Sequence, residues 1–281
     1  MQSDDKLALH AFHYRFCETA MPVLSAIYRY PVKSVKGLAM SQSEVTPLGL
    51  PDDRAWMVTS DEGVMITGRD YPEMVKIETD VDAHSLTLSA PGMPMLSIER
   101  SQFSAACDAH VWKDQFGAWT GAHEADAWIS DYLGRKARLL YTGDPQRRVR
   151  QHPDIPLSFA DGYPLLLIGE SSRLQLNEWV GRDMDMARFR PNLVVSGAEA
   201  FAEDGWKTIR IGNVVFQIDK PCGRCVFTTV DPHTAQKSDD QEPLRTIAKR
   251  RKGPEGAEFG QNVLARNAGQ IETGMPVEIL D

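Results

Sequence analysis

The sequence has 281 residues, of which 42% are hydrophobic and 25% are charged, a composition typical of a globular protein with one large domain or two smaller ones. Its formal net charge of −8 argues against a general nucleic-acid-binding protein, because a phosphate backbone attracts an excess of Lys and Arg. No apolar run approaches the roughly 20 residues that span a bilayer, and residues 1–20 lack the apolar core of a signal peptide, so we expect a cytoplasmic protein without a membrane partner.

Short runs typical of β-strands follow an N-terminal extension, residues 1–21, to which no role is assigned. Alternating or β-branched residues separated by turn residues predict strands at 23–30, 55–59, 64–66, 85–89 and 95–98. An amphipathic helix is predicted over 124–133, because its apolar residues recur at the helical spacing i, i+3, i+4, i+7 and i+8. The first third of the chain therefore predicts β-structure that closes on itself.

The rest of the chain repeats this pattern. Strands are predicted at 165–168, 192–195, 208–211, 214–218, 226–230 and 277–280, with helices at 171–180 and in a short segment from Pro243. The fold class indicated is mainly β with a few helices, α+β. The segment that begins at Asp144 and Pro145 is the best boundary between a smaller N-terminal domain and a larger C-terminal one.

Four cysteines, Cys17, Cys107, Cys222 and Cys225, are too few and too irregularly spaced for a disulfide framework, so free thiols in a reducing compartment are expected. The last two form the segment Cys222-Gly223-Arg224-Cys225, which admits three interpretations: a redox-active pair, half of a zinc site, or one metal ligand beside a second thiol.

The neighbouring residues weigh on these interpretations. A thioredoxin-like pair usually begins a helix, whereas the β-branched run at 226–230 predicts a strand and disfavours a redox pair. A structural zinc site needs about four ligands, and the other cysteines and the seven scattered His residues lack finger-like spacing. Both thiols could also be small buried hydrophobic residues.

Clustered arginines precede the cysteines by about thirty residues, in Arg188-Phe189-Arg190-Pro191-Asn192. A thiolate is a soft metal ligand, and a guanidinium group binds phosphate in a planar, bidentate way. Together they suit a soft metal carried on a phosphorylated organic cofactor.

Other motifs accompany these two in a fixed order: Tyr30-Pro31-Val32-Lys33-Ser34, Ser158-Phe159-Ala160-Asp161-Gly162-Tyr163-Pro164 and Phe259-Gly260-Gln261-Asn262. The order resembles the MOSC-domain proteins, the superfamily of the C-terminal domain of molybdenum cofactor sulfurase. It is most similar to the branch that holds the mitochondrial amidoxime reducing component and the bacterial YcbX-type reductases. The resemblance implies an N-terminal MOSC-associated β domain at 22–144 and a MOSC β-barrel domain at 145–281.

The resemblance also implies a molybdenum cofactor (Mo-molybdopterin) and a set of site residues. Cys225 stands at the second cysteine of the family's Cys-x-Arg-Cys segment, which implies that it ligates molybdenum and is the catalytic residue. Cofactor contacts are implied for Lys33, Ser34, Arg54, Asp161, Arg190, Asn192, Gly223, Arg224 and Asn262. Arg69 is a further candidate for the phosphate end.

The chemistry of these residue types agrees with such contacts, although each has an ordinary structural alternative. Arg190 and Asn192 enter a strand, where alternate side chains face the same way and could address one ligand. Taken alone, they would be a surface arginine and an asparagine that caps a turn. Lys33 and Ser34 would similarly be solvated loop residues, and Asp161 would bond its own turn.

The activity implied is two-electron reduction at molybdenum of N-hydroxylated compounds, such as amidoximes, hydroxylamines and N-hydroxylated bases. Many bacterial relatives continue into a ferredoxin-like domain, whereas this sequence stops at Asp281, so we expect a separate flavin, iron–sulfur or haem protein to deliver electrons. Two alternatives remain: a non-catalytic binder or carrier of the cofactor, and a metal-free protein that uses its two thiols for exchange.

One dense basic run lies near the C-terminus, at Arg245, Lys249, Arg250, Arg251 and Lys252. Most such runs are solvated faces of a helix. Alternatively, this run could dock an acidic electron donor, since complementary charge speeds the encounter between two proteins.

Overall fold

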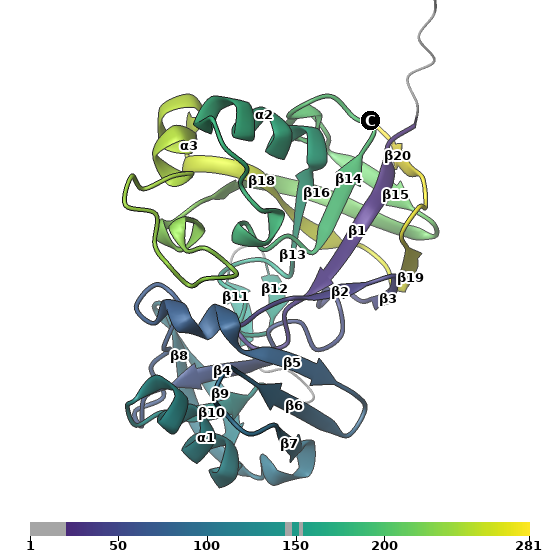
Figure 1. Cartoon of the computed structure of the whole chain (residues 1–281). Helices are drawn as coiled ribbons and strands as arrows, with labels where there is room; N and C mark the ends of the chain where they lie inside the picture. The colour runs from purple at the N-terminus through teal and green to yellow at the C-terminus, as the bar shows by residue number, and fades with distance from the viewer. Residues whose placement is uncertain (1–20, 144–147, 152–153) are drawn as a thin grey trace, which may run out of the picture.

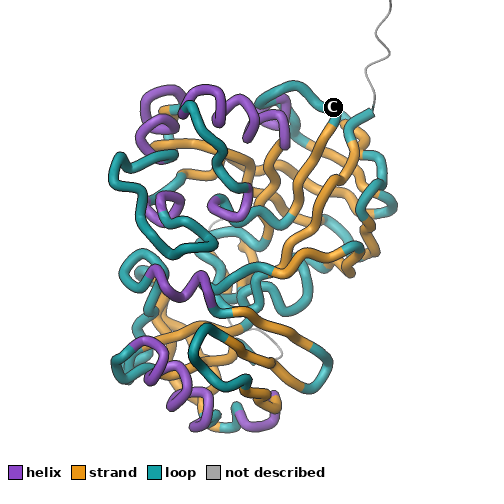
Figure 2. The backbone as a smooth tube through the Cα atoms, viewed as in Figure 1, coloured by secondary structure: helices purple, strands orange, loops and turns teal. Residues whose placement is uncertain are grey.

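The structure is a computed structural model that describes residues 21–143, 148–151 and 154–281. In this part of the chain the strands gather into two lobes, which lie one above the other in Figure 1. Figure 2 shows that strands, drawn in orange, outweigh helices in both lobes. The α-helices of the described residues are α1 (His123–Leu133), α2 (Glu170–Val180) and α3 (Leu244–Arg250). The predicted fold class, mainly β with a few helices, is confirmed.

The larger lobe is built on one nine-stranded sheet with the order β2-β1-β14-β13-β18-β16-β15-β20, in which β17 also pairs with β18. Its strands are β1 (Val23–Arg29), β2 (Leu38–Met40), β13 (Leu165–Gly169), β14 (Leu193–Ser196), β15 (Thr208–Ile211), β16 (Val214–Gly223), β17 (Lys252–Gly253), β18 (Gly256–Ala265) and β20 (Val277–Ile279). Apolar side chains such as Leu24, Leu165 and Phe216 point into one buried cluster, which is the core of this lobe.

The smaller lobe contains two antiparallel sheets, with the orders β4-β10-β9-β8 and β5-β6-β7. Their strands are β4 (Trp56–Thr59), β5 (Glu78–Val81), β6 (Ser85–Ser89), β7 (Leu96–Glu99), β8 (Ala105–Val111), β9 (Asp114–Thr120) and β10 (Arg138–Tyr141). Helix α1 buries Ala125, Trp128, Ile129 and Leu133 against them, as its predicted apolar stripe requires. Gly134, at φ +62, ends this helix in the left-handed conformation that glycine adopts most easily.

The two halves of the chain interlock. Strand β1 pairs with β14, so residues 23–27 belong to the sheet of the larger lobe, although the chain then enters the smaller one. The remaining short pairs are β3 (Gln42–Val45) with β19 (Gly269–Glu272), and β11 (Arg148–Gln151) with β12 (Asp154–Leu157). The predicted domain boundary, between residues 144 and 145, lies outside the described residues, as do residues 1–20 of the predicted extension 1–21, so this division stays a prediction.

Most predicted strands are confirmed within about a residue, and two are wrong. Residues 64–66 form no strand and make isolated bridges, Val64 to His110 and Met65 to Thr59. Residues 226–229 form a 3₁₀ helix, η5 (Val226–Thr229), instead of a strand. Its two threonine hydroxyls donate to the backbone carbonyls three residues earlier, and this local bonding competes with strand pairing.

In the described part of the chain, no helix combines the length and the apolar character needed to cross a membrane.

Candidate functional site

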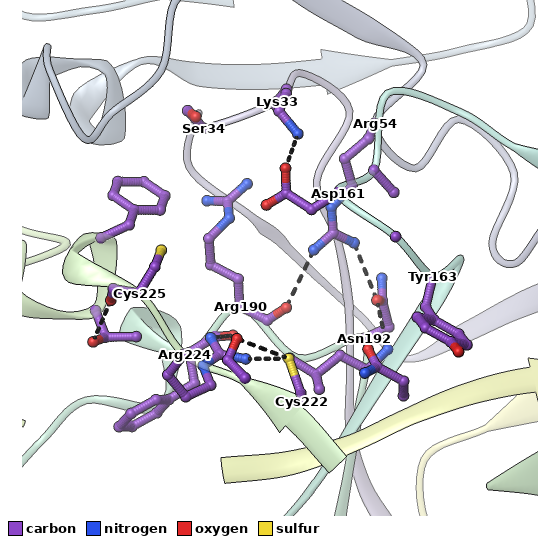
Figure 3. Close-up of a pocket in the computed structure, with 18 of the residues that line it drawn as sticks. Lys33, Ser34, Arg54, Asp161, Tyr163, Arg190, Asn192, Cys222, Arg224 and Cys225 are labelled. Atoms are coloured by element: carbon purple, nitrogen blue, oxygen red, sulfur yellow. Dashed lines mark hydrogen bonds and ion pairs between the residues drawn. The ribbon is translucent and has the colours of Figure 1, made fainter. Parts of the chain in front are cut away.

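A cavity of about 320 Å³ is lined by residues from both lobes (Figure 3). Its lining includes every predicted site residue: Lys33, Ser34, Arg54, Asp161, Arg190, Asn192, Gly223, Arg224, Cys225 and Asn262. These residues come from the loops beside β1 and β4, the loop before β13, the entrance to β14, the end of β16 and the middle of β18. Segments far apart in the sequence therefore meet at one cavity.

The cavity has a strong excess of positive charge. Six of its lining residues are cationic: Lys33, Arg54, Arg69, Arg188, Arg190 and Arg224. Among the described residues that line it, only Asp161 is acidic. A pocket of this kind favours an anionic ligand, and guanidinium groups favour phosphate in particular.

Two of these arginines stack on one aromatic ring. The guanidinium carbons of Arg54 and Arg190 lie 4.4 and 4.2 Å from the centre of the Tyr30 ring, and the Tyr30 hydroxyl donates to the Pro191 carbonyl. Arg190 also donates to the Val35 carbonyl at 2.6 Å. Burial, together with the charge of Arg54, lowers the pKa of Arg190 to about 10, which still leaves it charged at neutral pH.

Asn192 supports this arrangement from behind. Its side-chain oxygen accepts from Arg54 Nη1 at 3.0 Å and from the Leu166 amide at 3.2 Å, and its Nδ2 donates to the Tyr28 carbonyl. The expected alternation of Arg190 and Asn192 does not occur, because Arg190 has φ +55 and is not extended. In this geometry Asn192 positions Arg54, while Arg190 faces the cavity.

Backbone strain concentrates around the cavity. Among the described residues, eight that are not glycine have positive φ, and four of these line the cavity: Ser34, Arg54, Trp112 and Arg190. Each such residue costs on the order of 1–3 kcal/mol and persists only where its surroundings determine it. Strain of this kind is typical of ligand sites.

Asp161 is the centre of a polar network at the other side of the cavity. Its carboxylate accepts from Lys33 Nζ at 2.6 Å, from Trp112 Nε1 at 3.0 Å and from Arg69 Nη2 at 3.2 Å. Burial alone would raise the pKa of Asp161, but the charges of Lys33 and Arg69 more than offset this and hold it below its usual range. Burial lowers the pKa of Lys33, and the charge of Asp161 offsets only part of that shift.

Each cysteine of the Cys222–Cys225 segment has its own arginine. Arg69 Nε donates to Cys225 Sγ at 3.3 Å, and Arg224 Nη1 donates to Cys222 Sγ at 3.0 Å. Both thiols are free and neither is fully buried, but Cys222 packs against the apolar cluster that contains Phe189 and Phe259, so the interpretation as a small hydrophobic residue is weakened only for Cys225. The strand predicted at 226–230 was the reason to disfavour a redox pair. Because the 3₁₀ helix η5 follows Cys225 instead, that reason no longer holds.

Gly223 and Asn262 have structural partners as well as a place in the lining. A Cβ on Gly223 would lie 2.3 Å from the Glu255 carbonyl oxygen, so the tight packing of the neighbouring hairpin requires glycine there. Asn262 Nδ2 donates to the Pro221 carbonyl at 3.2 Å and so holds β18 to the cysteine strand.

Sequence reasoning gave no site role to several of the lining residues, among them Trp112, Phe227 and Arg188. Arg188 donates to Asp231 at 2.6 Å and to the Thr229 carbonyl, which ties the arginine segment to η5. The signal for Trp112 is its place in a two-residue turn between two strands, neither of which was predicted.

The residues present fit an anionic, metal-carrying cofactor. Within the described residues, Arg188 Nε, Arg190 Nη2 and Arg224 Nε are buried without a hydrogen-bond partner, which leaves guanidinium donors free for a ligand. No group of three or more His, Cys, Asp or Glu side chains in that part of the chain could hold a metal ion with protein ligands alone. A metal at Cys225 would therefore need ligands that the cofactor itself supplies.

Comparison with known proteins gives concordant matches. Residues 21–136 match the MOSC N-terminal beta barrel domain, and residues 154–278 match the MOSC domain. The mitochondrial amidoxime-reducing component 1 of Homo sapiens is 32% identical over 279 residues, covering 92% of this chain and 82% of the human protein. The mitochondrial amidoxime reducing component 2 of Rattus norvegicus is 32% identical over 90% of this chain and 82% of its own.

Among solved structures, the YUAD protein of Bacillus subtilis covers 92% of this chain and 94% of its own, at 10% identity and a TM-score of 0.41, too low to add to the assignment.

Proposed function

Because the chain belongs to the MOSC-domain family that contains the mitochondrial amidoxime-reducing components, we propose that it is a molybdenum-cofactor-dependent reductase of N-hydroxylated compounds. One observation carries the proposal: the free thiol of Cys225 lines a cavity with six cationic side chains. A thiolate and clustered guanidinium groups are the donors that a molybdenum pterin with a phosphate end needs.

The residues divide the binding between them. Arg54, Arg190, Lys33 and Ser34 would hold the phosphate end through charge and backbone or side-chain donors, and Cys225 would ligate the metal. Asp161, which is ionised at neutral pH, would accept hydrogen bonds from ring N–H groups and would not donate a proton. Arg224 and Asn262 would border the cofactor from the strands behind it.

When bound, the cofactor would supply the two-electron reduction of the N–O bond. The overall reaction consumes one N-hydroxylated group, two protons and two electrons, and it releases the corresponding N–H compound and one water. The chain's own residues bind and orient the cofactor, and the hydrogen bond from Arg69 keeps the Cys225 thiol turned into the cavity.

The first test is elemental analysis and pterin detection on protein from a molybdenum-replete host, with benzamidoxime reduction assayed with a chemical electron donor. We expect near-stoichiometric molybdopterin and reduction in the wild type, and neither metal retention nor reduction in Cys225→Ser. Cys222→Ser is the matched control and should keep both, because its thiol bonds Arg224 and not Arg69. Molybdopterin without reduction would favour a cofactor carrier. A protein without molybdenum would favour the alternative in which Cys222 and Cys225 act in thiol exchange.

Electrons would come from a separate acidic donor protein that docks on α3. This helix packs on η5, which directly follows Cys225, so a donor seated there would lie close to the thiol. Arg245 and Arg251 pair with Glu242 and Asp204, whereas Lys249, Arg250 and Lys252 expose their side chains.

A double charge reversal, Lys249→Glu with Lys252→Glu, should lower donor-dependent turnover several-fold at low salt and reduce its salt sensitivity. Turnover with a chemical donor should not change. Lys207→Glu, an exposed lysine on another face, is the control. Equal salt dependence in the wild type and the double variant would exclude this docking surface.

A further inference from the structure

Trp112 stands where a β-hairpin normally has a glycine. Strands β8 and β9 stay paired as far as Val111 and Asp114, which leaves Trp112 and Lys113 as a two-residue loop. Trp112 has φ +57 at the first loop position, where turns of this length favour glycine because a Cβ is crowded there. A bulky residue in the left-handed region is a genuine outlier and calls for a functional explanation.

The fold gains little burial from this indole, because 56% of the residue is exposed. Its polar contacts point instead to the cavity: Trp112 Nε1 donates to Asp161 at 3.0 Å, and the Arg69 guanidinium carbon lies 4.6 Å from the ring centre. Arg69 in turn donates to Cys225 Sγ. A single residue, Arg69, therefore links the indole to the Cys225 thiol, and the indole lies at the accessible side of the cavity that it lines.

Exposed aromatic surface held in a fixed orientation is suited to stacking. The indole presents a large, polarisable face that favours offset stacking with aromatic rings and contact with planar cations such as amidinium groups. The two contacts to Asp161 and Arg69 fix the ring before a ligand arrives, so that binding does not have to immobilise it.

We propose that Trp112 is the stacking platform that selects planar, conjugated N-hydroxylated substrates, such as aryl amidoximes and N-hydroxylated heteroaromatic bases, over small aliphatic ones. The assignment rests on the proposed reductase function and adds a specificity-determining residue to it. A residue that only supports Arg69 and Asp161 would instead affect all substrates alike.

The test compares Trp112→Gly and Trp112→Phe with the wild-type holoenzyme, using a chemical electron donor and two substrates, benzamidoxime and acetamidoxime. For Trp112→Gly we expect KM for benzamidoxime to rise about tenfold with little change in kcat, and KM for acetamidoxime to stay within about twofold. Trp112→Phe keeps a stacking ring without the N–H donor, and it should hold the benzamidoxime KM within about threefold.

Thermal denaturation provides the matched structural control. Since glycine suits the turn, Trp112→Gly should unfold at a temperature no lower than the wild type, so a loss of affinity would not come from misfolding. An equal effect of Trp112→Gly on both substrates, or a fall in kcat with unchanged KM, would overturn the platform and leave a supporting role.

Binding of benzamidine, the product of benzamidoxime reduction, separates this proposal from the reductase function. If the wild type reduces neither substrate, the reductase function fails, and calorimetry with benzamidine still decides the platform. The wild type and Trp112→Phe should then bind benzamidine about tenfold more tightly than Trp112→Gly, whereas equal affinities would overturn the platform.

Discussion

The two walls of the cavity are built differently. In the inner wall (Arg54, Arg190 and Asn192), the side chains are held by stacking on Tyr30, which lies behind them, and by hydrogen bonds to protein groups, and Tyr30 and Asn192 are almost completely buried. In the outer wall (Arg69, Trp112 and Asp161), the Trp112 residue is 56% exposed and the Asp161 side chain is 53% exposed. An anchored cationic wall suits a ligand that stays bound, whereas an accessible wall suits a ligand that is exchanged.

The positive φ values sharpen this difference. Arg54 and Arg190 are left-handed in the inner wall, where their guanidinium groups are stacked on Tyr30 and bonded to backbone carbonyls. Trp112 is left-handed in the outer wall, where its contacts are few and its ring is accessible. The contacts around Arg54 and Arg190 therefore account for the backbone strain of the inner wall. The strain at Trp112 in the outer wall has no such structural account and points to a functional role.

Arg190→Ala should give the largest effect, because it removes a cation from the inner wall. A charge-assisted hydrogen bond contributes about 1.5–3 kcal/mol, so we expect cofactor retention to weaken roughly 10- to 100-fold. The measurement is molybdenum and pterin content after extended dialysis of the purified protein.

Arg210→Ala is the control for Arg190→Ala, since Arg210 lies on β15 and pairs with the partly exposed Glu278 away from the cavity. The control should retain the wild-type cofactor content. If Arg190→Ala retained it as well, the inner wall would not be the anchor, and the comparison of the walls would fail.

Gly68→Ala should give the next largest effect, because it disturbs the outer wall without removing a charge. A Cβ on Gly68 would lie 2.4 Å from Phe227 Cε2, so either the ring or the loop that carries Arg69 must move. We expect the contact between Arg69 and Cys225 to be lost and kcat/KM to fall about tenfold, which is the effect of roughly 1.4 kcal/mol, while cofactor content stays near that of the wild type.

Gly205→Ala is the matched control, because its nearest neighbour would be 3.6 Å away and its φ of −90° accepts alanine. It should leave kcat/KM unchanged. A loss of cofactor in Gly68→Ala would show that the two walls are not separate in function.

The fold was predictable only in part, because the missed strands include the apolar β10 as well as strands beside the cavity. The β6 and β15 ranges match their predictions, since residues there alternate between buried and less buried positions. Strand β18 was not predicted, because Glu258, Gln261 and Asn262 interrupt its apolar pattern. Polar residues that line the site therefore break the apolar pattern by which this strand would be predicted.

The site was predictable as a set of residues but not as a set of contacts. All the residues predicted from the motifs line one cavity. By contrast, Asn192 is held in place to support Arg54 by bonds to Tyr28 and Leu166, and no sequence spacing indicates these contacts. Trp112 was missed because recognising its turn requires β8 and β9 to be identified first.

Asp161→Asn should give the smallest effect, and it tests whether the outer wall contributes to stability as well as to binding. The pKa of Asp161 is lower in the folded protein than its usual value near 3.9, so its ion pairs stabilise the fold above that pH, and the contribution is lost as the pH falls below it. Because the carboxylate is half exposed, solvent screening limits this to about 1 kcal/mol. Denaturant unfolding of the cofactor-free protein should show Asp161→Asn less stable than the wild type at pH 7, with the gap closing progressively as the pH falls below about 4. The exposed Asp239→Asn should follow the wild type throughout, and a constant gap for Asp161→Asn would mean that its charge does not stabilise the outer wall.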